Sequence, residues 1–498
     1  SVLPVIGFRP DIIHCHDWQT GLVPVYLHDS FQQNEFFWNI KTIMTIHNLK
    51  FQGVWDVQTI KNITGLSDYY FTADKLEAYK DANYLKGGIV FADAVTTVSN
   101  TYAEEIKTPF YGEKLDGLMC ARANSLRGIV NGIDYNEFNP ETDPYITKTY
   151  NATTFRKEKV KNKLQLQRDL GLQEDPKTMM IGIVSRLTDQ KGFDLIAYVM
   201  DELCQDAIQL VILGTGDERY ENMFRHFDWK YHGKVSAQIY YDEAMSHRIY
   251  AASDAFLMPS LFEPCGLSQL MSMRYGTVPM VRETGGLKDT VEAYNEFEHT
   301  GNGFSFHNYN AHEMLYMIRY ATKIYFGYPK EWEAIIKRGM AMDYSWSASA
   351  SKYAEIYEGL YRRSEEDRRR DHKWQQEYEE REQKRLEAEL RVKLMMEAEL
   401  AEREAAIKKA EEEVALKEAE KAAAQKATSK ETEKKAVQKA ASKETEQEVI
   451  QKAAEKEAAE KQTGKKKTSA SKKQSAKTTK TGTTSSAKKT TTQKTSKK

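Results

Sequence analysis

The sequence contains few cysteines and no long apolar run. Its four cysteines, Cys15, Cys120, Cys204 and Cys265, are widely spaced and form no CxxC pair. This spacing argues against a disulfide framework or a zinc site, and it suits a reducing compartment. No stretch approaches the ~18 consecutive apolar residues that span a bilayer. The N-terminal stretch also lacks the charged start and apolar core of a signal peptide, so we expect no membrane association.

A surplus of charge of one sign is also lacking. The formal net charge over 498 residues is -1, which indicates neither a nucleic acid nor a membrane as partner. This average conceals a split in composition. Up to Arg363 the chain mixes aromatic residues, glycine, proline and apolar runs, whereas charged residues and alanine dominate from Ser364 onward. The whole chain of 498 residues is long enough for two or three domains with full cores.

The most informative stretch, residues 259–291, contains two turns that each open a predicted helix. Glu263 lies in the first turn, and Gly285-Gly286 form the second. Helix N-termini present free N–H groups and partial positive charge, which suit a phosphate or a sugar hydroxyl. The Glu263 carboxylate could bind a sugar hydroxyl, support a cationic transition state, or simply cap a helix. We interpret Cys265 as a small, near-buried residue rather than a nucleophile, because no histidine adjoins it.

Short apolar strands followed by polar residues and helices recur along the chain. This alternation predicts parallel sheets with helical crossovers, whose carboxyl edges bind ligands. Two doubly wound domains facing across a cleft are the architecture we expect. The first series of predicted strands is 12–13, 41–46, 95–98 and 127–130, and the second is 179–184, 210–213, 238–241, 255–258 and 278–281. The predicted helices include 18–28, 192–203, 267–275 and a helical region over 311–363.

Several polar groups at the predicted strand ends have two interpretations. Arg186 and Lys191 lie on one strand-to-helix loop, where they could hold a diphosphate or be ordinary exposed cations. Tyr241 could stack on a base or pack within the sheet. A turn formed by residues 14–17, together with His47, has the composition of a metal site, but we place sugar hydrogen bonding well ahead of metal binding.

The tail has a different composition from the rest of the chain. Residues 364–461 are rich in strong helix formers with many i,i+4 pairs of opposite charge, and they contain a 13-residue repeat that begins at Gln425. Leu386 and Leu400 follow a heptad spacing, but glutamates interrupt the seam. A solvated single helix is therefore favoured over a coiled coil. Residues 462–498 are predicted to be a disordered, solubilising segment.

Taken together, the motifs resemble those of bacterial glycogen synthase and plant starch synthase, which are retaining glucosyltransferases with the GT-B fold. The matching motifs cover residues 11–360 and include PDIIHCHDWQTGL, TIHNLKFQG, VNGIDYNEFNP, SRLTDQKGFDLI, YYDEAMSHRIY, PSLFEPCGLSQLMSMRYGTVP and RETGGLKDTV. Many other GT-B enzymes carry a second glutamate where Met271 stands here, as glycogen and starch synthases allow. The resemblance implies six parts: a partial N-terminal Rossmann-like domain on the glucan-acceptor side (1–150), a linker (151–176), a C-terminal Rossmann-like nucleotide-sugar domain (177–335), helices packing back on the N-terminal domain (336–363), the charged helical tail (364–461) and the disordered end (462–498).

The resemblance implies that the chain transfers glucose from ADP-glucose to an α-1,4-glucan without a metal or cofactor. Glu263 would hold the transferred glucose, and His16 and Asn131 would approach it from the N-terminal domain. Arg186 and Lys191 would stabilise the departing nucleotide. The remaining implied contacts are stacking of Tyr241 on adenine, backbone N–H groups from Cys265, Gly266 and Leu267, and the lining of the phosphate and sugar site by Thr284, Gly285 and Gly286.

One motif of the family is missing from this sequence. The family's N-terminal KxGGL loop does not occur before Asp11, so we expect an incomplete N-terminal domain and an inactive or poorly folded chain. The alternatives are a GT-B enzyme that uses another nucleotide sugar, such as UDP-glucose, and an inactive glucan-binding or scaffold protein whose tail recruits a partner. The bacterial cytoplasm is the expected location, with the plastid as the alternative for a plant or algal source.

Overall fold

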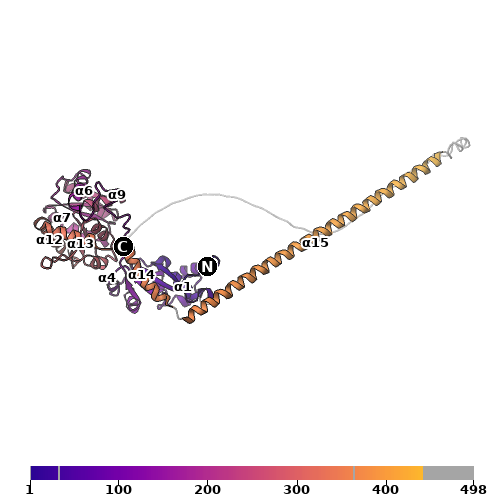
Figure 1. Cartoon of the computed structure of the whole chain (residues 1–498), viewed down its shortest axis with the longest axis horizontal. Helices are drawn as coiled ribbons and strands as arrows, with labels where there is room; N and C mark the ends of the chain where they lie inside the picture. The colour runs from indigo at the N-terminus through magenta and orange to yellow at the C-terminus, as the bar shows by residue number, and fades with distance from the viewer. Residues whose placement is uncertain (1, 32–33, 363–364, 441–498) are drawn as a thin grey trace, which may run out of the picture. The chain divides into compact units, whose positions relative to one another are not determined.

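A computed structural model describes residues 2–31, 34–362 and 365–440 of the chain (Figure 1). The chain divides into a first compact unit, Ser1–Arg381, and a second unit, Glu382–Lys498. The first unit contains two parallel sheets, each surrounded by helices. We call the part around the first sheet the N-terminal lobe and the part around the second sheet the C-terminal lobe.

The N-terminal lobe is built on a four-stranded sheet with the order β1-β2-β6-β7, and all its pairs are parallel. Five of the six residues of β2 are buried, as expected for a central strand covered on both faces. A small antiparallel sheet, β3-β5-β4, lies in the same lobe. The elements are β1 (Ile12–His16), α1 (Leu22–Asp29), β2 (Lys41–Ile46), β3 (Val54–Asp56), α2 (Val57–Thr64), β4 (Glu77–Ala78), β5 (Asp81–Asn83), α3 (Tyr84–Phe91), β6 (Ala94–Thr97), α4 (Asn100–Glu105), α5 (Asp116–Ala121) and β7 (Leu126–Gly128), with short 3-10 turns at Trp18–Thr20, Glu35–Phe37 and Asp68–Tyr70.

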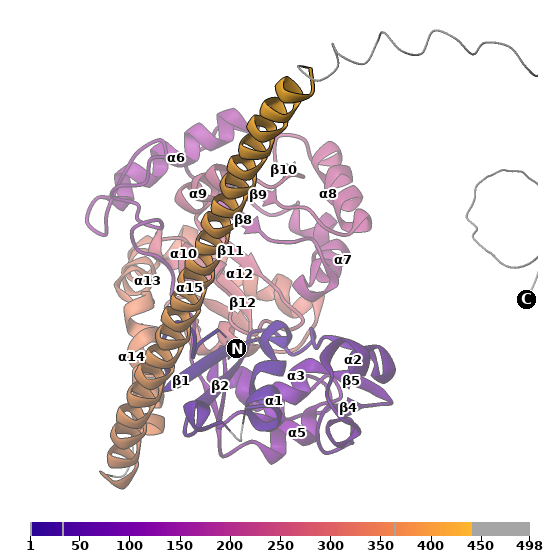
Figure 2. The same ribbon diagram turned by 90° about the vertical axis from the view of Figure 1, so that its right-hand side faces the viewer.

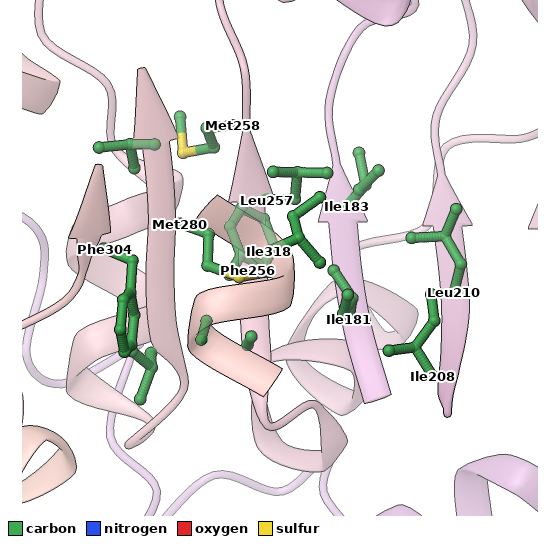
Figure 3. Close-up of a cluster of buried hydrophobic side chains, with 14 of the residues drawn as sticks. Ile181, Ile183, Ile208, Leu210, Phe256, Leu257, Met258, Met280, Phe304 and Ile318 are labelled. Atoms are coloured by element: carbon green, nitrogen blue, oxygen red, sulfur yellow. The ribbon is translucent and has the colours of Figure 1, made fainter. Parts of the chain in front are cut away.

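The C-terminal lobe is built on a six-stranded parallel sheet with the order β10-β9-β8-β11-β12-β13. Every residue of β9, β11 and β12 is buried, which explains their almost continuous apolar sequences. Side chains such as Ile181, Leu210 and Met280 form the core beneath the helices (Figure 3). The elements are β8 (Met179–Val184), a 3-10 turn (Asp189–Lys191), α7 (Phe193–Leu203), β9 (Ile208–Leu213), α8 (Glu218–Lys230), β10 (Val235–Gln238), α9 (Glu243–Ala252), β11 (Ala255–Met258), α10 (Ser268–Arg274), β12 (Val278–Arg282), α11 (Gly285–Thr290), β13 (Phe304–Phe306), α12 (Ala311–Gly327) and α13 (Pro329–Ala341).

Two helices bracket the C-terminal lobe in sequence. The first is α6 (Phe155–Asp169), which packs on α9, and the second is α14 (Trp346–Tyr361), which packs on β1 of the N-terminal lobe (Figure 2). The Ser349 hydroxyl on α14 donates a hydrogen bond to the Val130 carbonyl at 2.7 Å. The helix that follows the C-terminal lobe therefore returns to the lobe in which the chain began.

Most predicted elements of the two sheets are present, but several boundaries were wrong, including the end of the strand predicted at 127–130, which is β7 (Leu126–Gly128). The turn predicted at 14–17 begins only at Asp17, because β1 continues to His16. The strand predicted at 238–241 ends at Gln238, so the two tyrosines that follow lie outside the sheet. The helix predicted over 18–28 is divided into a 3-10 turn and α1. The predicted domain boundaries stay predictions.

The last helix, α15 (Glu365–Ala440), agrees with the predicted helical tail over the part that the structure describes. All described side chains from Gln383 to Lys426 are exposed, including Leu386 and Leu400 at the heptad positions. The coiled-coil alternative stays a prediction. The end of the repeat and the segment 462–498 lie outside the described residues.

Within the described residues, no helix combines the length and apolar character that crossing a membrane requires.

Candidate active site

The candidate residues of the C-terminal lobe follow the carboxyl ends of its strands. Arg186 follows β8, Tyr241 follows β10, Glu263 follows β11, and Thr284 follows β12. Because parallel strands share one carboxyl edge, these residues lie along a single edge of the sheet. That is the edge at which open α/β sheets bind their ligands.

Glu263 and Lys191 form a buried ion pair at this edge. The Lys191 Nζ atom lies 2.6 Å from Glu263 Oε2, and the Ser260 hydroxyl donates to the same oxygen at 3.1 Å. The side chains are only 8% and 16% exposed for Glu263 and Lys191, so water screens their attraction little. Gly192 adopts φ +72°, and a Cβ there would overlap the Pro259 carbonyl oxygen, so the turn that presents Lys191 requires glycine.

The second glycine turn packs directly on the backbone of Glu263. The Gly286 N–H donates to the Glu263 carbonyl oxygen at 3.1 Å. Gly285 has φ +45°, and a Cβ at that position would overlap the same carbonyl oxygen. The turn and the carboxylate are therefore one packed unit, although they follow different strands.

At this turn, each lobe supplies one carboxylate that accepts hydrogen bonds from the other lobe. Glu105 at the end of α4 accepts hydrogen bonds from the Thr284 hydroxyl at 2.9 Å and from the Gly285 N–H at 3.1 Å. In the opposite direction, Asp289 on α11 accepts from the Thr101 N–H at 3.1 Å and from its hydroxyl at 2.6 Å. Each short helix thus has an N–H group satisfied by a carboxylate of the other lobe.

Burial raises the pKa of Glu105. The hydrogen bonds from Gly285 and Thr284 oppose this rise, as does the charge of Arg282. The carboxyl is therefore balanced between desolvation, which favours protonation, and donors that favour the anion.

Cys265 is 5% exposed, which confirms that it is near-buried. Burial raises the pKa of its thiol to about 12, and the Asn131 backbone N–H opposes the rise. The thiol is therefore neutral at physiological pH and is a poor nucleophile. The same interaction places Asn131 of the N-terminal lobe beside this turn. Gly266 has φ +71°, and Leu267 is the N-cap residue of α10.

Three histidines gather at the carboxyl edge of the N-terminal sheet. The rings of His14 and His16 stack with centroids 4.3 Å apart, and His16 Nδ1 lies 3.0 Å from His47 Nε2. Burial and the neighbouring histidines lower the pKa of His14 to about 4, and burial followed by His47 also lowers the pKa of His16. Both rings are therefore neutral at pH 7.

Arg186 and Tyr241 are exposed, as are His16 and Leu267 of the predicted set. The Tyr241 side chain is 86% exposed, and no described residue forms an ion pair with Arg186. The loops that carry them are joined through the turn at residues 214–217. The Gly214 N–H donates to the Gln238 carbonyl, and the Leu187 N–H donates to the Thr215 carbonyl. The structure therefore brings these two side chains to one edge without joining them to Glu263.

An aromatic hollow of about 540 Å³ adjoins the histidine edge of the N-terminal lobe. Trp18, Phe51, Trp55 and Tyr79 supply its aromatic walls, and Lys50 also lines it. The Lys50 Nζ lies 5.8 Å from the ring centroid of Phe262, the residue before Glu263. The hollow thus extends towards the buried carboxylate.

The sequence motifs did not identify Glu105, Asp289 or Ser260. Each acts through a contact made only in the folded chain, and Glu105 lies 180 residues from Gly285. Only the recurrence of acids on short helices at the two carboxyl edges could have suggested these contacts between the lobes.

Comparisons with known proteins agree with this arrangement. Residues 1–121 match the family described as starch synthase catalytic domain, and residues 165–338 match glycosyl transferases group 1. A glycogen synthase from Lachnospira eligens is 71% identical over 360 residues, which cover 72% of this chain and 75% of that protein. A glycogen synthase from Geobacillus thermodenitrificans is 50% identical over 365 residues, which cover 73% and 75%. The catalytic domain of starch synthase IV from Arabidopsis thaliana, bound to ADP and acarbose, superposes with a TM-score of 0.67 at 34% identity, covering 73% of this chain and 75% of that one.

Two parallel sheets with the candidate residues at their carboxyl edges, together with these matches, define a glycosyltransferase of the GT-B class. Within that class, the chain belongs to the glycogen synthase family.

Proposed function

We propose that this chain transfers glucose from ADP-glucose to the non-reducing end of an α-1,4-glucan with retention of configuration. The observation that carries the proposal is the buried pair of Lys191 and Glu263, fixed by two glycine turns at the carboxyl edge of the C-terminal sheet. A cation beside a carboxylate there can receive a diphosphate and a sugar hydroxyl together.

The two ends of the donor would contact different members of this pair. The diphosphate takes Lys191 and the exposed Arg186, while a glucose hydroxyl donates to Glu263. Tyr241, which lies outside the sheet, is free to stack on adenine. The backbone N–H groups of the turn at residues 265–267 and the turn at residues 284–286 line the sugar and phosphate.

The reaction breaks the bond between glucose C1 and the β-phosphate oxygen and forms a bond from C1 to the acceptor 4-hydroxyl oxygen. The proton of that hydroxyl passes to the departing diphosphate, so attack and departure occur on the same face. Lys191 and Arg186 stabilise the charge that develops on the diphosphate. The neutral rings of His14 and His16, together with Asn131, would form a second wall that places no opposing positive charge beside the sugar cation.

The acceptor would reach C1 over the aromatic hollow. Sugar rings present apolar faces that pack on aromatic side chains, and Trp18, Phe51 and Trp55 offer such surfaces. Since Lys50 joins the hollow to Phe262, a glucan end lying there points towards Glu263. The relative bound to ADP and acarbose is consistent with an adenine nucleotide and a glucan-like ligand for this chain. We also propose a cytoplasmic location, while a partner for the tail stays a prediction.

Radiolabelled glucose incorporation into glycogen by the full chain tests the proposal. ADP-glucose and UDP-glucose are assayed in parallel with wild type, Glu263→Gln and, as a control, the exposed Glu218→Gln on α8. We expect incorporation from ADP-glucose, because the pair of Lys191 and Glu263 is in place, a loss of about 10²–10³-fold in kcat for Glu263→Gln, and an unchanged control. No incorporation by the wild-type chain would instead support the hypothesis that a chain without the KxGGL loop is inactive. More incorporation from UDP-glucose than from ADP-glucose would show that UDP-glucose is the donor. Full activity of a folded Glu263→Gln variant would remove this residue from the mechanism.

A further inference from the structure

A cluster of ligating side chains lies apart from all the residues assigned to the substrate above. Glu243 and His247 are one turn apart at the start of α9, and Glu137 belongs to the segment that follows β7. One ring nitrogen of His247 and one carboxylate oxygen from each glutamate all lie within 4.8 Å of one another. Among the described residues, this is the one group of three or more such side chains arranged closely enough to hold a metal ion.

The histidine is fixed in the orientation that a ligand requires. Its Nδ1 atom lies 2.8 Å from Asp143 Oδ2 and 3.2 Å from the Tyr275 hydroxyl, which itself donates to Asp143 at 2.5 Å. The Phe138 ring stacks on the imidazole with centroids 4.8 Å apart and planes at 17°. An Asp–His pair of this kind sets the tautomer of a metal-binding histidine and raises its basicity.

The other ring nitrogen has no partner in the described structure. His247 is fully buried, and its Nε2 atom forms no hydrogen bond there. A buried polar atom of this kind costs free energy unless something satisfies it. Asp143 and Tyr275 are the hydrogen-bond partners of Nδ1. The Nε2 atom is therefore the ring nitrogen available to bind an ion together with Glu137 and Glu243.

The two glutamates face each other across that position. One carboxylate oxygen of each glutamate lies within 4.8 Å of the other. Two carboxylates this close repel each other, and a cation between them would remove the repulsion. Both glutamates are exposed, so their side chains can close around an ion without moving the backbone.

We propose that Glu137, Glu243 and His247 bind a first-row divalent cation, with Zn²⁺ the best match. One imidazole nitrogen and two carboxylate oxygens suit Zn²⁺, whose bonds to such ligands are about 2.0–2.2 Å long, and water completes the coordination. The ion ties the segment after β7 to α9 of the C-terminal lobe. None of the three ligands contacts the substrate in the proposed function, so we assign the ion no part in the glucose transfer.

Metal titration of the full chain tests this site. Protein freed of metal with EDTA and then desalted is titrated with Zn²⁺ by calorimetry and with Co²⁺ by absorption spectroscopy. The wild type should bind one equivalent at the site and show Co²⁺ d–d bands. Glu137→Gln and Glu243→Gln should each weaken Zn²⁺ binding by at least about 10–100-fold, because the loss of even an outer-shell partner of a metal ligand costs that much. Glu141→Gln, an exposed acid on the same segment, should bind as the wild type does.

The variants also separate this site from other zinc-binding groups. Glu137 lies in no helix, so Glu137→Gln should keep the wild-type circular dichroism and unfolding temperature in EDTA, and it decides the outcome if Glu243→Gln perturbs α9. Equal affinities in wild type and Glu137→Gln would overturn the proposal. So would Zn²⁺ binding that persists in the Glu137/Glu243 double variant and disappears in His16→Asn or Cys120→Ser, because the ion would then lie at the histidine edge or on the exposed thiol.

Discussion

His14 shows how a single residue at the histidine edge is held neutral. Its Nε2 lies 2.6 Å from the Thr45 hydroxyl and its Nδ1 2.8 Å from the Tyr357 hydroxyl. Burial, with His16 and His47 nearby, lowers its pKa to about 4 from 6.5. Between these two pH values the unfolded chain binds a proton that the folded chain does not, so the free energy of unfolding rises with pH there.

The His14→Gln variant should therefore lose part of the acid sensitivity of the wild type. The wild type is expected to keep the contribution of His14 above pH 6.5 and to lose it as the pH falls towards 4. Glutamine does not titrate, so the unfolding temperature of the variant should fall less over this range. Thermal unfolding at several pH values from 4 to 7 measures the difference. The exposed His226→Gln serves as control, and parallel curves for His14→Gln and wild type would contradict the assignment.

At the residue scale, the sequence identified side chains whose role depends on their own strand end. Lys191 and Glu263 were both expected at the carboxyl edge, and the structure pairs them. Glu105 could not be predicted, because its importance comes from one contact with Gly285 made across the two lobes. Motif spacing reports on neighbours along the chain and contains no information about such a contact.

Among the elements, the turn that opens α11 depends on Gly285. A side chain there must adopt φ +45° and would overlap the Glu263 carbonyl oxygen. Gly285→Ala should lower the free energy of unfolding by more than about 1–2 kcal/mol, the cost of left-handed backbone alone, and should lower kcat by displacing Glu263. Denaturant unfolding and glucose incorporation measure the two effects. Gly117→Ala on α5, where a Cβ meets open space, should be neutral or slightly stabilising. Equal free energies of unfolding and equal kcat values for the two variants would show that the turn accommodates a side chain at residue 285.

The hydrogen bonds between α4 and α11 join the two lobes beside the candidate site. We therefore expect the loss of one of them to lower the enzymatic activity. Glu105→Ala leaves the Gly285 N–H and the Thr284 hydroxyl without their acceptor, and we expect kcat/KM to fall by about 10-fold, as for the loss of one charged hydrogen bond. Glu105→Gln keeps one acceptor oxygen and should recover part of the loss. The neighbouring Glu104→Ala, which removes only a surface pair with Lys107, is the matched control.

Steady-state kinetics with varied ADP-glucose separates positioning from folding. If Glu105 positions the turn, kcat and KM change while the unfolding temperature of Glu105→Gln stays near that of the wild type. A fall in stability with unchanged kinetics would make the contact purely structural.

The predicted elements were most accurate where their sequences were long and apolar. The buried strands β8 and β11 were found with the correct ends, since continuous burial leaves a continuous apolar run. The short strands β3, β4, β5 and β13 were missed, because two or three residues contain too little pattern. The end of β10 was misplaced because Tyr240 and Tyr241 favour strands by type but lie outside the sheet.

On the scale of the whole molecule, the order of motifs predicted two sheets with facing sites, but not where the first compact unit ends. The composition changes at Ser364, whereas the unit extends to Arg381. The reason is the first part of α15. Trp374 packs edge-on against Phe36 with ring centroids 5.7 Å apart, and Tyr378 donates a hydrogen bond to the Pro4 carbonyl at 3.3 Å. These aromatic contacts could not be predicted, because the sequence around Trp374 and Tyr378 has the charged, helix-forming composition of the tail.

Trp374 should therefore stabilise the N-terminal lobe, although it lies in the charged tail. It joins a cluster formed by Phe36, Phe37 and Ile40. Because the indole is only partly buried, we expect Trp374→Ala in the full chain to cost about 1–2 kcal/mol, less than the roughly 3–5 kcal/mol for a fully buried aromatic side chain. Leu386→Ala, on the same helix but 57% exposed, should leave the free energy of unfolding unchanged. Chemical unfolding followed by circular dichroism compares the two. If Trp374→Ala left the free energy of unfolding unchanged, the lobe would fold without help from α15. The folded domain would then end where the composition changes, at Ser364.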